Sequence, residues 1–480
     1  MDARGAEGAV LVRRGRRPVD RCRGPGGGAG RAGARHAPDR RDGDSRVTPT
    51  QIGIAGLVGL FVLVAVHVPL AFAMIAVGIV AFALQTSWGP ALTFLATEPA
   101  QVLSSMDLTA VPLFLIMGAF VNVSGFSKDL YGAAAALLGH RRGGLAYATI
   151  GGSAAFGAIC GSSPATVATF TRVALPEMLA RGYSSSFSGA TIAAGGAMKA
   201  LIPPSLSMII YCVVARAYIF DVFIAAVVPA LITIAANVAA ITLLVRWSPG
   251  LAPVSDKVPA AERRGALLRA LPAVLLIGTI FTGLYSGIFT VNEAASVAAV
   301  VSFAFAALRR TITFDNFVTG MRDTAATAGM IYFILIGSSV FTYFISLPMI
   351  PEQLIKLVGE VELPPVGVIV LMLGVYLVLG SVFDELAAMI VTLPFALPII
   401  LHLGYDPVWW GVINVVIVEL GLIIPPIGLV ILIINAMRPD IPLPKLYRTI
   451  LPFVAADMLV LGVLTAFPNL ALWLPGLLRG

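Results

Sequence analysis

Ile202-Pro203-Pro204-Ser205 and Ile424-Pro425-Pro426-Ile427-Gly428 are the two stretches that decide how this sequence folds. Each is a double proline inside an apolar segment long enough to cross a bilayer. Proline lacks a backbone N–H and clashes with the preceding turn, so each pair is expected to break its helix near mid-membrane. A break at that depth is stable only where protein buries it or where it lines a polar cavity. Two such breaks at matching positions in two halves of a chain are typical of a secondary transporter's binding site.

The composition indicates an integral membrane protein. Of the 480 residues, 58% are hydrophobic and 12% are charged, whereas soluble domains carry about 25% charged residues. Apolar stretches recur from Ile52 to Leu474, so the membrane part is one polytopic unit. The chain lacks His-Glu-x-x-His, Gly-x-Ser-x-Gly and Gly-Lys-Ser/Thr motifs. We therefore expect no enzyme, no catalytic residues, no transition metal, no organic cofactor, no direct use of ATP and no nucleic-acid partner.

Residues 1–46 differ from the rest of the chain. They contain 12 Arg and 6 acidic residues, so they contribute +6 to a net charge of +7. They are rich in Gly and Pro and show no apolar periodicity, which predicts disorder. One explanation is a basic arm that contacts anionic lipid. We favour another, a mis-assigned start, with translation beginning near Val47.

The whole chain, residues 1–46 included, divides into six predicted parts by its apolar runs and connectors. Residues 85–107 are expected to form a loop, 314–324 an interfacial helix, and 348–364 an acidic loop. Trp409-Trp410 is expected to be an aromatic anchor at the membrane interface. The predicted parts are the disordered arm (1–46), N-terminal scaffold helices (47–140), a first transport repeat (141–220), scaffold helices with a connector and interfacial helix (221–362), a second transport repeat (363–437) and a C-terminal scaffold helix (438–480).

Each transport repeat is predicted to begin with a re-entrant hairpin. The tips are Gly161-Ser162-Ser163-Pro164-Ala165-Thr166 and Gly380-Ser381-Val382-Phe383-Asp384-Glu385. The arms of the first hairpin have about 15 residues, and a full crossing needs about 20. Small and polar residues at a tip suit a turn inside the membrane. We therefore expect two hairpins, each followed by a broken helix.

The landmarks of the two repeats are in register. The Gly182-Tyr183 and Gly404-Tyr405 pairs are 222 residues apart, and so are the double prolines. Placing the loops rich in Lys and Arg in the cytoplasm makes the first hairpin enter from the cytoplasm and the second from outside. The sequence therefore predicts an all-α membrane protein with inverted repeats, an arrangement that supports alternating access.

A broken helix offers carbonyl oxygens for a cation and N–H groups for an anion, and the tips add hydroxyls. Packing is the plain explanation for the Ser and Thr residues, and a wet tip is the plain explanation for Asp384. Lys199 is expected to face a substrate carboxylate, to pair with an acid such as Glu419, or to extend along its helix toward water. The candidates for Na⁺ are Ser162, Ser163, Thr166, Pro203, Ser381, Asp384, Pro425 and Gly428, and those for the substrate are Thr169, Lys199, Pro204, Ser205 and Pro426.

Several of these motifs together resemble a known family, the large membrane subunit (DctM-like) of tripartite ATP-independent periplasmic (TRAP) transporters. The resemblance covers the chain from about Ile52 to its end. The motifs that carry it are Gly143-Gly144, Gly161-Ser162-Ser163-Pro164-Ala165-Thr166, Ala174-Leu175-Pro176-Glu177-Met178, Arg181-Gly182-Tyr183, Ile202-Pro203-Pro204-Ser205, Glu293-Ala294-Ala295, Gly404-Tyr405-Asp406-Pro407 and Ile424-Pro425-Pro426-Ile427-Gly428.

The resemblance implies a multi-pass permease of the bacterial inner membrane, with an elevator-type fold of the ion-transporter superfamily. It implies Na⁺-coupled import of an organic anion such as a C4-dicarboxylate, keto acid or sialic acid. It also implies two partners, a small four-helix (DctQ-like) membrane subunit and a periplasmic (DctP-like) solute-binding protein. Lys199 stands where the family usually has a small residue, and Val430 where many members have Asn.

Two other functions are compatible with the residues. A stand-alone Na⁺/dicarboxylate or citrate symporter also uses inverted hairpins, and it would transport without a binding protein. An intramembrane hydrolase would need a second acid or base facing a Ser or Asp at a tip, and the sequence shows no obvious pair.

Overall fold

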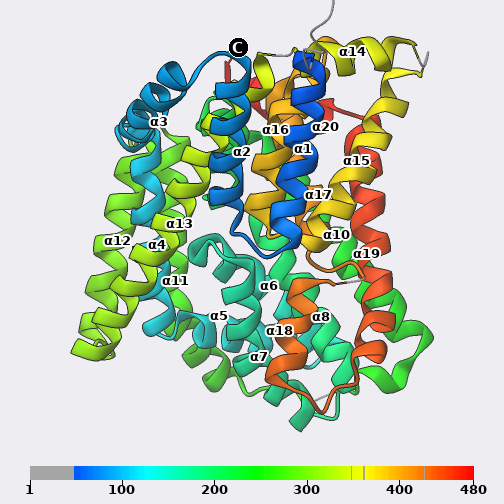
Figure 1. Ribbon diagram of the computed structural model, residues 1–480. Coiled ribbons are helices and arrows are strands. Elements are labelled where there is room, and N and C mark those ends of the chain that lie inside the picture. Colours follow the sequence, from blue (N-terminus) through cyan, green and yellow to red (C-terminus); the bar gives the residue numbers. More distant parts are fainter. Residues whose placement is uncertain (1–47, 255, 348, 361–362, 426, 480) are drawn as a thin grey trace, which may run out of the picture. The chain divides into compact units, whose positions relative to one another are not determined.

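The computed structural model describes residues 48–479 except 255, 348, 361–362 and 426 (Figure 1). Within these residues all regular secondary structure is helical, so the all-α prediction is confirmed. The predictions for residues 1–46 and for Pro426 lie outside the described residues.

The described chain forms twenty α-helices and three short 3₁₀ helices. In chain order they are α1 (Pro49–Ala65), α2 (Leu70–Gln85), α3 (Trp88–Leu103), η1 (Met106–Thr109), α4 (Ala110–Val123), α5 (Phe126–Leu138), α6 (Gly144–Cys160), α7 (Ser163–Ala180), α8 (Ser185–Ala197), η2 (Met198–Leu201), α9 (Leu206–Ala215), α10 (Ile219–Trp247), η3 (Pro249–Leu251), α11 (Ala260–Tyr285), α12 (Val291–Leu308), α13 (Phe314–Ser346), α14 (Ile350–Glu360), α15 (Pro365–Val382), α16 (Glu385–His402), α17 (Pro407–Gly421), α18 (Leu429–Met437), α19 (Leu443–Ala466) and α20 (Asn469–Arg479).

The described helices give a polytopic membrane protein. Eight of them are long and apolar enough to span a bilayer, or nine if the bent pair Ser185–Leu201 and Leu206–Ala215 counts as one span. The arms of the second predicted hairpin, α15 and α16, have 18 residues each and pass this length test. The re-entrant character of the hairpins therefore stays a prediction.

Both double prolines interrupt a helix, as predicted. The first break lies between η2 and α9, where the two parts of the span bend by 40°. The second lies between α17 and α18, and Gly428 has a left-handed φ of 54° there. Glycine adopts this conformation without the steric cost that a Cβ brings.

The two broken helices connect the two hairpins. The α8 half packs on α6 and α7, while the α9 half packs on α16. The second broken helix reverses this arrangement, since α17 packs on α15 and α16 while α18 packs on α7 and α8. Figure 1 shows α6, α7, α8 and α18 in the lower half of the view and α16 and α17 in the upper half. Each break therefore lies where the chain passes from one hairpin to the other.

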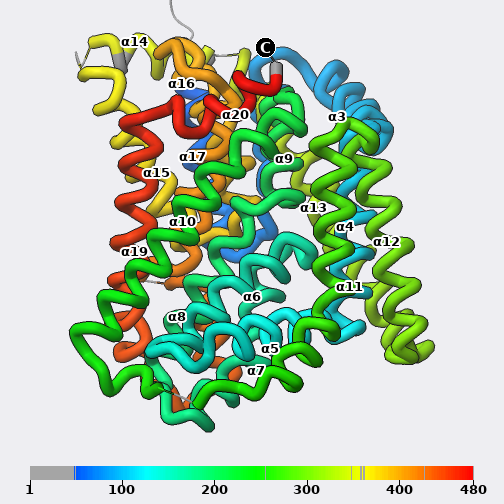
Figure 2. The backbone as a smooth tube through the Cα atoms, turned by 180° about the vertical axis from the view of Figure 1, so that it is seen from behind, coloured from blue at the N-terminus to red at the C-terminus, as the bar shows by residue number. Residues whose placement is uncertain are grey.

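The remaining helices pack around these two repeats. α2 lies against α13, α4 against α12, and α10 against α19. In Figure 2 the long α10 runs from the top of the view to the bottom, beside α19. These pairs belong to the segments that the sequence predicts as scaffold.

Three local predictions differ from the structure. Residues 88–103 form α3, whose buried Glu98 accepts a hydrogen bond from Ser339 on α13. Residues 314–324 are the start of α13, because Thr313 caps the helix and no proline interrupts it before Ser346. Most of the expected acidic loop is the helix α14.

The prediction that Trp409-Trp410 is an exposed aromatic anchor is also wrong. Both indoles have no exposed surface, and Trp409 Nε1 donates to the Leu464 carbonyl at 3.0 Å. Asp406 Oδ1 caps α17 by accepting from Val408 N, so both tryptophans lie in the first turn of this buried helix. An aromatic pair near a helix start is therefore a core element here.

The contact between α15 and α17 allows a direct test of helix packing. A Cβ on Gly421 would lie 2.5 Å from the Gly380 carbonyl carbon, which is rigid backbone. We expect Gly421→Ala to destabilise the protein by about 1–3 kcal/mol, because overpacking a tight contact forces the backbone to move. Gly374→Ala on α15 is the control, since a Cβ there meets open space. Thermal unfolding in detergent should show a lower melting temperature for the first variant only, and equal values would contradict the predicted clash.

Candidate ion and substrate site

Five polar side chains from five elements meet where the two hairpin tips approach each other. They are Ser163, Lys199, Ser207, Glu385 and Glu419, and we call them the tip cluster. All five are buried. They come from α7, η2, α9, α16 and α17 respectively, so both hairpins and both broken helices contribute.

Lys199 holds the centre of the tip cluster. Its Nζ donates to Glu385 Oε1 at 3.0 Å and to the Gly161 carbonyl at 3.1 Å. Glu419 Oε1 lies 3.8 Å from the same nitrogen. The Lys199 side chain has 0% exposure, so the prediction that it extends to water is wrong. Its alternative, pairing with Glu419, is correct, although Glu385 is the nearer partner.

Two hydroxyls complete the network. Ser163 Oγ lies 3.0 and 3.2 Å from the two carboxylate oxygens of Glu419 and 3.4 Å from Glu385 Oε2. Ser207 Oγ donates to Glu385 Oε1 at 3.1 Å. Ser163 thus connects the first tip to the second tip and to α17.

Local chain geometry places these groups. Gly161 ends α6 with a φ of 71°, and Ser162 then caps α7 by accepting from Ala165 N at 3.3 Å. In the second tip Asp384 caps α16 by accepting from Leu386 N at 3.3 Å. Ser163 and Glu385 are therefore the first residues of their helices. A carboxylate at a helix start is stabilised by the helix dipole.

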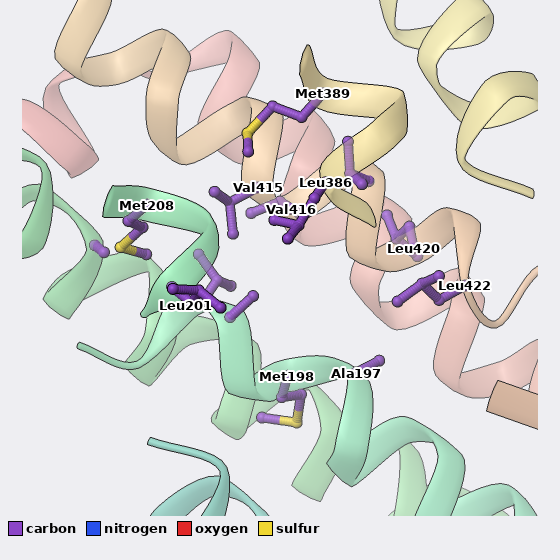
Figure 3. Close-up of a cluster of buried hydrophobic side chains, with 14 of the residues drawn as sticks. Ala197, Met198, Leu201, Met208, Leu386, Met389, Val415, Val416, Leu420 and Leu422 are labelled. Atoms are coloured by element: carbon purple, nitrogen blue, oxygen red, sulfur yellow. The ribbon is translucent and has the colours of Figure 1, made fainter. Parts of the chain in front are cut away.

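Buried apolar side chains, which we call the apolar shell, pack beside the tip cluster at Glu419. Figure 3 shows members of this shell from α8, η2, α9, α16 and α17, and from the residue that follows α17. The labelled members are Ala197, Met198, Leu201, Met208, Leu386, Met389, Val415, Val416, Leu420 and Leu422. In such surroundings an unpaired charge is strongly disfavoured, while a paired and hydrogen-bonded charge is tolerated.

The other predicted hydroxyl and carboxylate ligands make local contacts. Thr166 Oγ1 donates to the Ser162 carbonyl at 2.8 Å, and Ser381 Oγ to the Val378 carbonyl at 2.8 Å. Thr169 Oγ1 lies 3.4 Å from Asn122 Oδ1 on α4. Ser162 and Asp384 act as the helix caps described above. Their predicted ligand roles stay predictions.

The residues of the two breaks follow, along the chain, elements that carry members of the tip cluster, η2 and α17. Pro203, Pro204 and Ser205 are in the first break, and the buried Ser205 Oγ has no hydrogen-bond partner among the described residues. Pro425 and Gly428 are in the second break, where the Tyr447 hydroxyl donates to the Ile427 carbonyl at 2.5 Å. The Ser205 hydroxyl is therefore a buried, unpartnered polar group at the first break.

Sequence reasoning did not find Ser207, and it placed Asp384 ahead of Glu385. Ionisable residues at membrane depth are functional candidates by default. Applied to every acid in an apolar segment, this rule selects Glu385 and Glu419 together. Ser207 carries no such signal, because a serine two residues after Ser205 resembles ordinary helix packing.

Two cavities border the site. One of about 310 Å³ lies between α4, the first tip and α13, and its lining includes Asn122, Ser162, Thr319 and Thr327. A second of about 20 Å³ lies between Glu419 and Asp457. That volume is enough for one water-sized particle.

A second buried carboxyl group borders the small cavity. Asp457 Oδ1 on α19 accepts from Asn237 Nδ2 on α10 at 2.6 Å. No group of three or more His, Cys, Asp or Glu side chains is placed to hold a metal ion in the part of the chain that the structure describes.

Known proteins match this chain along most of its length. The sequence profile of the "Tripartite ATP-independent periplasmic transporter, DctM component" family matches residues 57–470. The chain is 34% identical to the C4-dicarboxylate TRAP transporter large permease protein DctM of Pseudomonas aeruginosa, over 77% of this chain and 86% of that protein. It is 27% identical to the sialic acid TRAP transporter large permease protein SiaM of Vibrio cholerae, over 89% and 99% respectively.

A third relative is the ectoine/5-hydroxyectoine TRAP transporter large permease protein UehC of Ruegeria pomeroyi. It is 32% identical, over 77% of this chain and 86% of that protein. These matches and the eight apolar spans establish a multi-pass protein of the bacterial inner membrane.

Solved transporter structures share the fold. The Alcanivorax borkumensis YdaH transporter has a TM-score of 0.54 at 17% identity, covering 80% of this chain and 89% of that one. Neisseria gonorrhoeae MtrF has a TM-score of 0.54 at 14% identity, covering 79% and 84%. Because the family profile covers both tip motifs and both double-proline motifs, and a relative is 34% identical over 77% of the chain, the chain belongs to the DctM family, the large permease subunits of TRAP transporters.

Proposed function

We propose that this permease imports an organic anion, coupled to the entry of Na⁺, and performs no catalysis. A periplasmic solute-binding protein delivers the anion, and a small four-helix membrane subunit completes the complex. The observation that carries the proposal is the charge of the tip cluster, in which one ammonium faces two carboxylates. The substrate class follows the relatives, whose names include C4-dicarboxylate and sialic acid transporters.

The charge balance favours a cation. With Lys199, Glu385 and Glu419 ionised, the buried tip cluster carries one excess negative charge. A buried net charge of this kind costs several kcal/mol unless a counterion or proton neutralises it. Carboxylate, hydroxyl and carbonyl oxygens are the ligands that hard cations prefer. A coupling Na⁺ near Glu419 therefore stabilises this arrangement of the two tips.

The substrate is assigned to the region beside the first tip. The cavity between α4, the first tip and α13 is lined by apolar side chains, by amide and hydroxyl groups, and by the carboxylate of Asp323. Its amide N–H and hydroxyl groups can hydrogen-bond a carboxylate-bearing solute. The start of α9 presents backbone N–H groups at the first break, next to the free hydroxyl of Ser205. Thr169, Pro204 and Ser205 are the substrate contacts we propose from this placement.

The packing supports movement of the two repeats as one body. Because each broken helix packs on both hairpins, residues 141–220 and 363–437 interlock. We propose that this body moves against the scaffold formed by residues 47–140, 221–362 and 438–480. The tip cluster then travels with the substrate, which links cation binding to solute movement.

Reconstitution tests the function. Proteoliposomes holding both membrane subunits should take up the organic anion only with an inward Na⁺ gradient and with the solute-bound binding protein outside. Replacing Na⁺ by choline should reduce uptake to background. Substantial uptake without any binding protein would instead indicate a stand-alone symporter.

Ser163→Ala tests the role of the first tip. Loss of its hydroxyl removes a hydrogen bond to a carboxylate, and such bonds contribute about 1.5–3 kcal/mol. We expect the apparent affinity for Na⁺ to fall about tenfold, which corresponds to about 1.4 kcal/mol.

Pro204→Ala should lower uptake in the same assay, because the break loses its fixed geometry.

The matched control is Ser153→Ala on α6. Ser153 is equally buried on the same hairpin, but its Oγ has no hydrogen-bond partner among the described residues. Its removal should leave the Na⁺ dependence of uptake unchanged. If Ser163→Ala and Pro204→Ala behave like this control, the first tip and its break have no part in the cation site.

A further inference from the structure

The Lys199 ammonium has the surroundings of a bound cation. Its Nζ contacts one backbone carbonyl oxygen and one carboxylate oxygen at 3.0–3.1 Å, with a second carboxylate oxygen at 3.8 Å. The hydroxyls of Ser163 and Ser207 hold those carboxylates in place. The atoms around the ammonium are carbonyl and carboxylate oxygens, and hydroxyl groups bind the carboxylates. Hard cations prefer oxygen ligands of these kinds.

The carbonyl comes from the C-terminal end of a helix. Gly161 follows α6 directly, and the C-terminal end of a helix carries partial negative charge. The other two ligands come from the second tip and from α17. A compact ammonium at this point therefore joins the two tips as a monovalent cation would.

The neighbouring chain makes room for the lysine stem. A Cβ on Gly157 would lie 2.3 Å from Lys199 Cβ, so α6 can pass this side chain only with glycine at that position. Lys199 itself is in η2, at the start of the break. Its side chain is wholly enclosed and fixed to the part of the protein that carries the tips.

We infer that Lys199 Nζ occupies the position of one coupling cation, as a cation tethered to the chain. The transport role of this position rests on the proposed Na⁺ coupling. The existence of a cation position is argued separately, from the oxygen contacts of Lys199 Nζ. The tethered ammonium travels with the tips in both directions and is never released. Because the ammonium fills one cation position permanently, one Na⁺ fewer crosses the membrane with each solute than if that position were open to Na⁺.

Two substitutions of Lys199 distinguish a cation site from an ordinary ion pair. Lys199→Gly removes the ammonium and its stem, which opens the position to Na⁺. Lys199→Met removes the charge but fills the volume, so the position stays closed. Each variant, and the wild type, is purified as the complex of both membrane subunits, and thermal unfolding is followed in NaCl and in choline chloride at equal ionic strength.

Lys199→Gly should gain a stabilisation by Na⁺ of several degrees beyond that of the wild type, and Lys199→Met should show none of this gain. If folded Lys199→Gly is recovered only from Na⁺ buffer and not from choline buffer, that also supports the inference, because folding then depends on Na⁺. An equal Na⁺ response in all three proteins overturns the inference. So does failure of Lys199→Gly to fold in either salt while Lys199→Met folds in both.

A flux measurement tests the number of Na⁺ ions carried with each solute. In proteoliposomes Lys199→Gly should carry one more Na⁺ per solute than the wild type, and an unchanged ratio would contradict the tethered cation. The unfolding assay needs neither solute nor binding protein. It therefore tests the cation position even if uptake by the wild type proves independent of Na⁺, a result that would remove the proposed coupling alone.

Discussion

Lys199→Met is expected to lower the stability of the protein by about 3–5 kcal/mol, the usual cost of removing one partner from a buried ion pair. Glu385 and Glu419 would remain as two buried carboxylates without the ammonium that lies 3.0 and 3.8 Å from them. Methionine preserves most of the side-chain volume, so the loss reports charge rather than a cavity. The measurement is thermal unfolding of the purified complex in choline buffer.

A second substitution should restore part of this loss. Adding Glu385→Gln to Lys199→Met removes one carboxylate together with the ammonium, and neutral replacement of a buried pair is often tolerated. Lys445→Met on the exposed face of α19 is the control, and it should leave the melting temperature within experimental error. If Lys199→Met is as stable as this control, the ion pair does not hold the tips together.

Glu419→Gln is expected to reduce Na⁺-driven uptake at least tenfold while the protein stays folded. Without the Glu419 charge, Lys199 and Glu385 balance each other at 3.0 Å, so the tip cluster no longer attracts a further cation. The amide oxygen of glutamine can still accept from Ser163, which preserves the contact of the first tip. The initial rate of uptake as a function of Na⁺ concentration is the measurement.

Glu177→Gln serves as the matched control for this experiment. Glu177 is on α7, an arm of the first hairpin, at the end of the helix away from the tip, and it forms a partly exposed pair with Arg181 at 2.7 Å. Exposed pairs contribute about 0–1 kcal/mol, so this variant should transport like the wild type. Glu419→Gln with an unaltered Na⁺ dependence would show that its charge is not part of the coupling.

The sequence predicts the helix breaks well because their cause is local. A double proline removes backbone donors wherever it occurs, and the common spacing of 222 residues relates the two halves. Helices α3 and α13 were harder to predict. Proline at position 99 and the polar residues of 314–324 resemble loop and interface sequence, but packing on α13 and the cap at Thr313 favour continuous helices.

The site was only partly predictable because its contacts are not local. Lys199 and Glu385 are 186 residues apart, and Ser163 and Glu419 are 256 apart. The sequence identifies each as polar in an apolar segment, but only the crossing of the broken helices brings them together. Asp384 and Ser162 carry the strongest local signal at the two tips. In the structure that signal corresponds to helix caps.

If the tip cluster couples cation entry to solute entry, the two fluxes are linked. Proteoliposomes with both membrane subunits and the solute-bound binding protein allow the uptake of radioactive Na⁺ and of labelled organic anion to be measured together. We expect a fixed ratio of Na⁺ to solute for the wild type and a lower Na⁺ share for Glu419→Gln. An identical ratio in the two proteins, or solute entry without any Na⁺ in the wild type, would contradict this coupling.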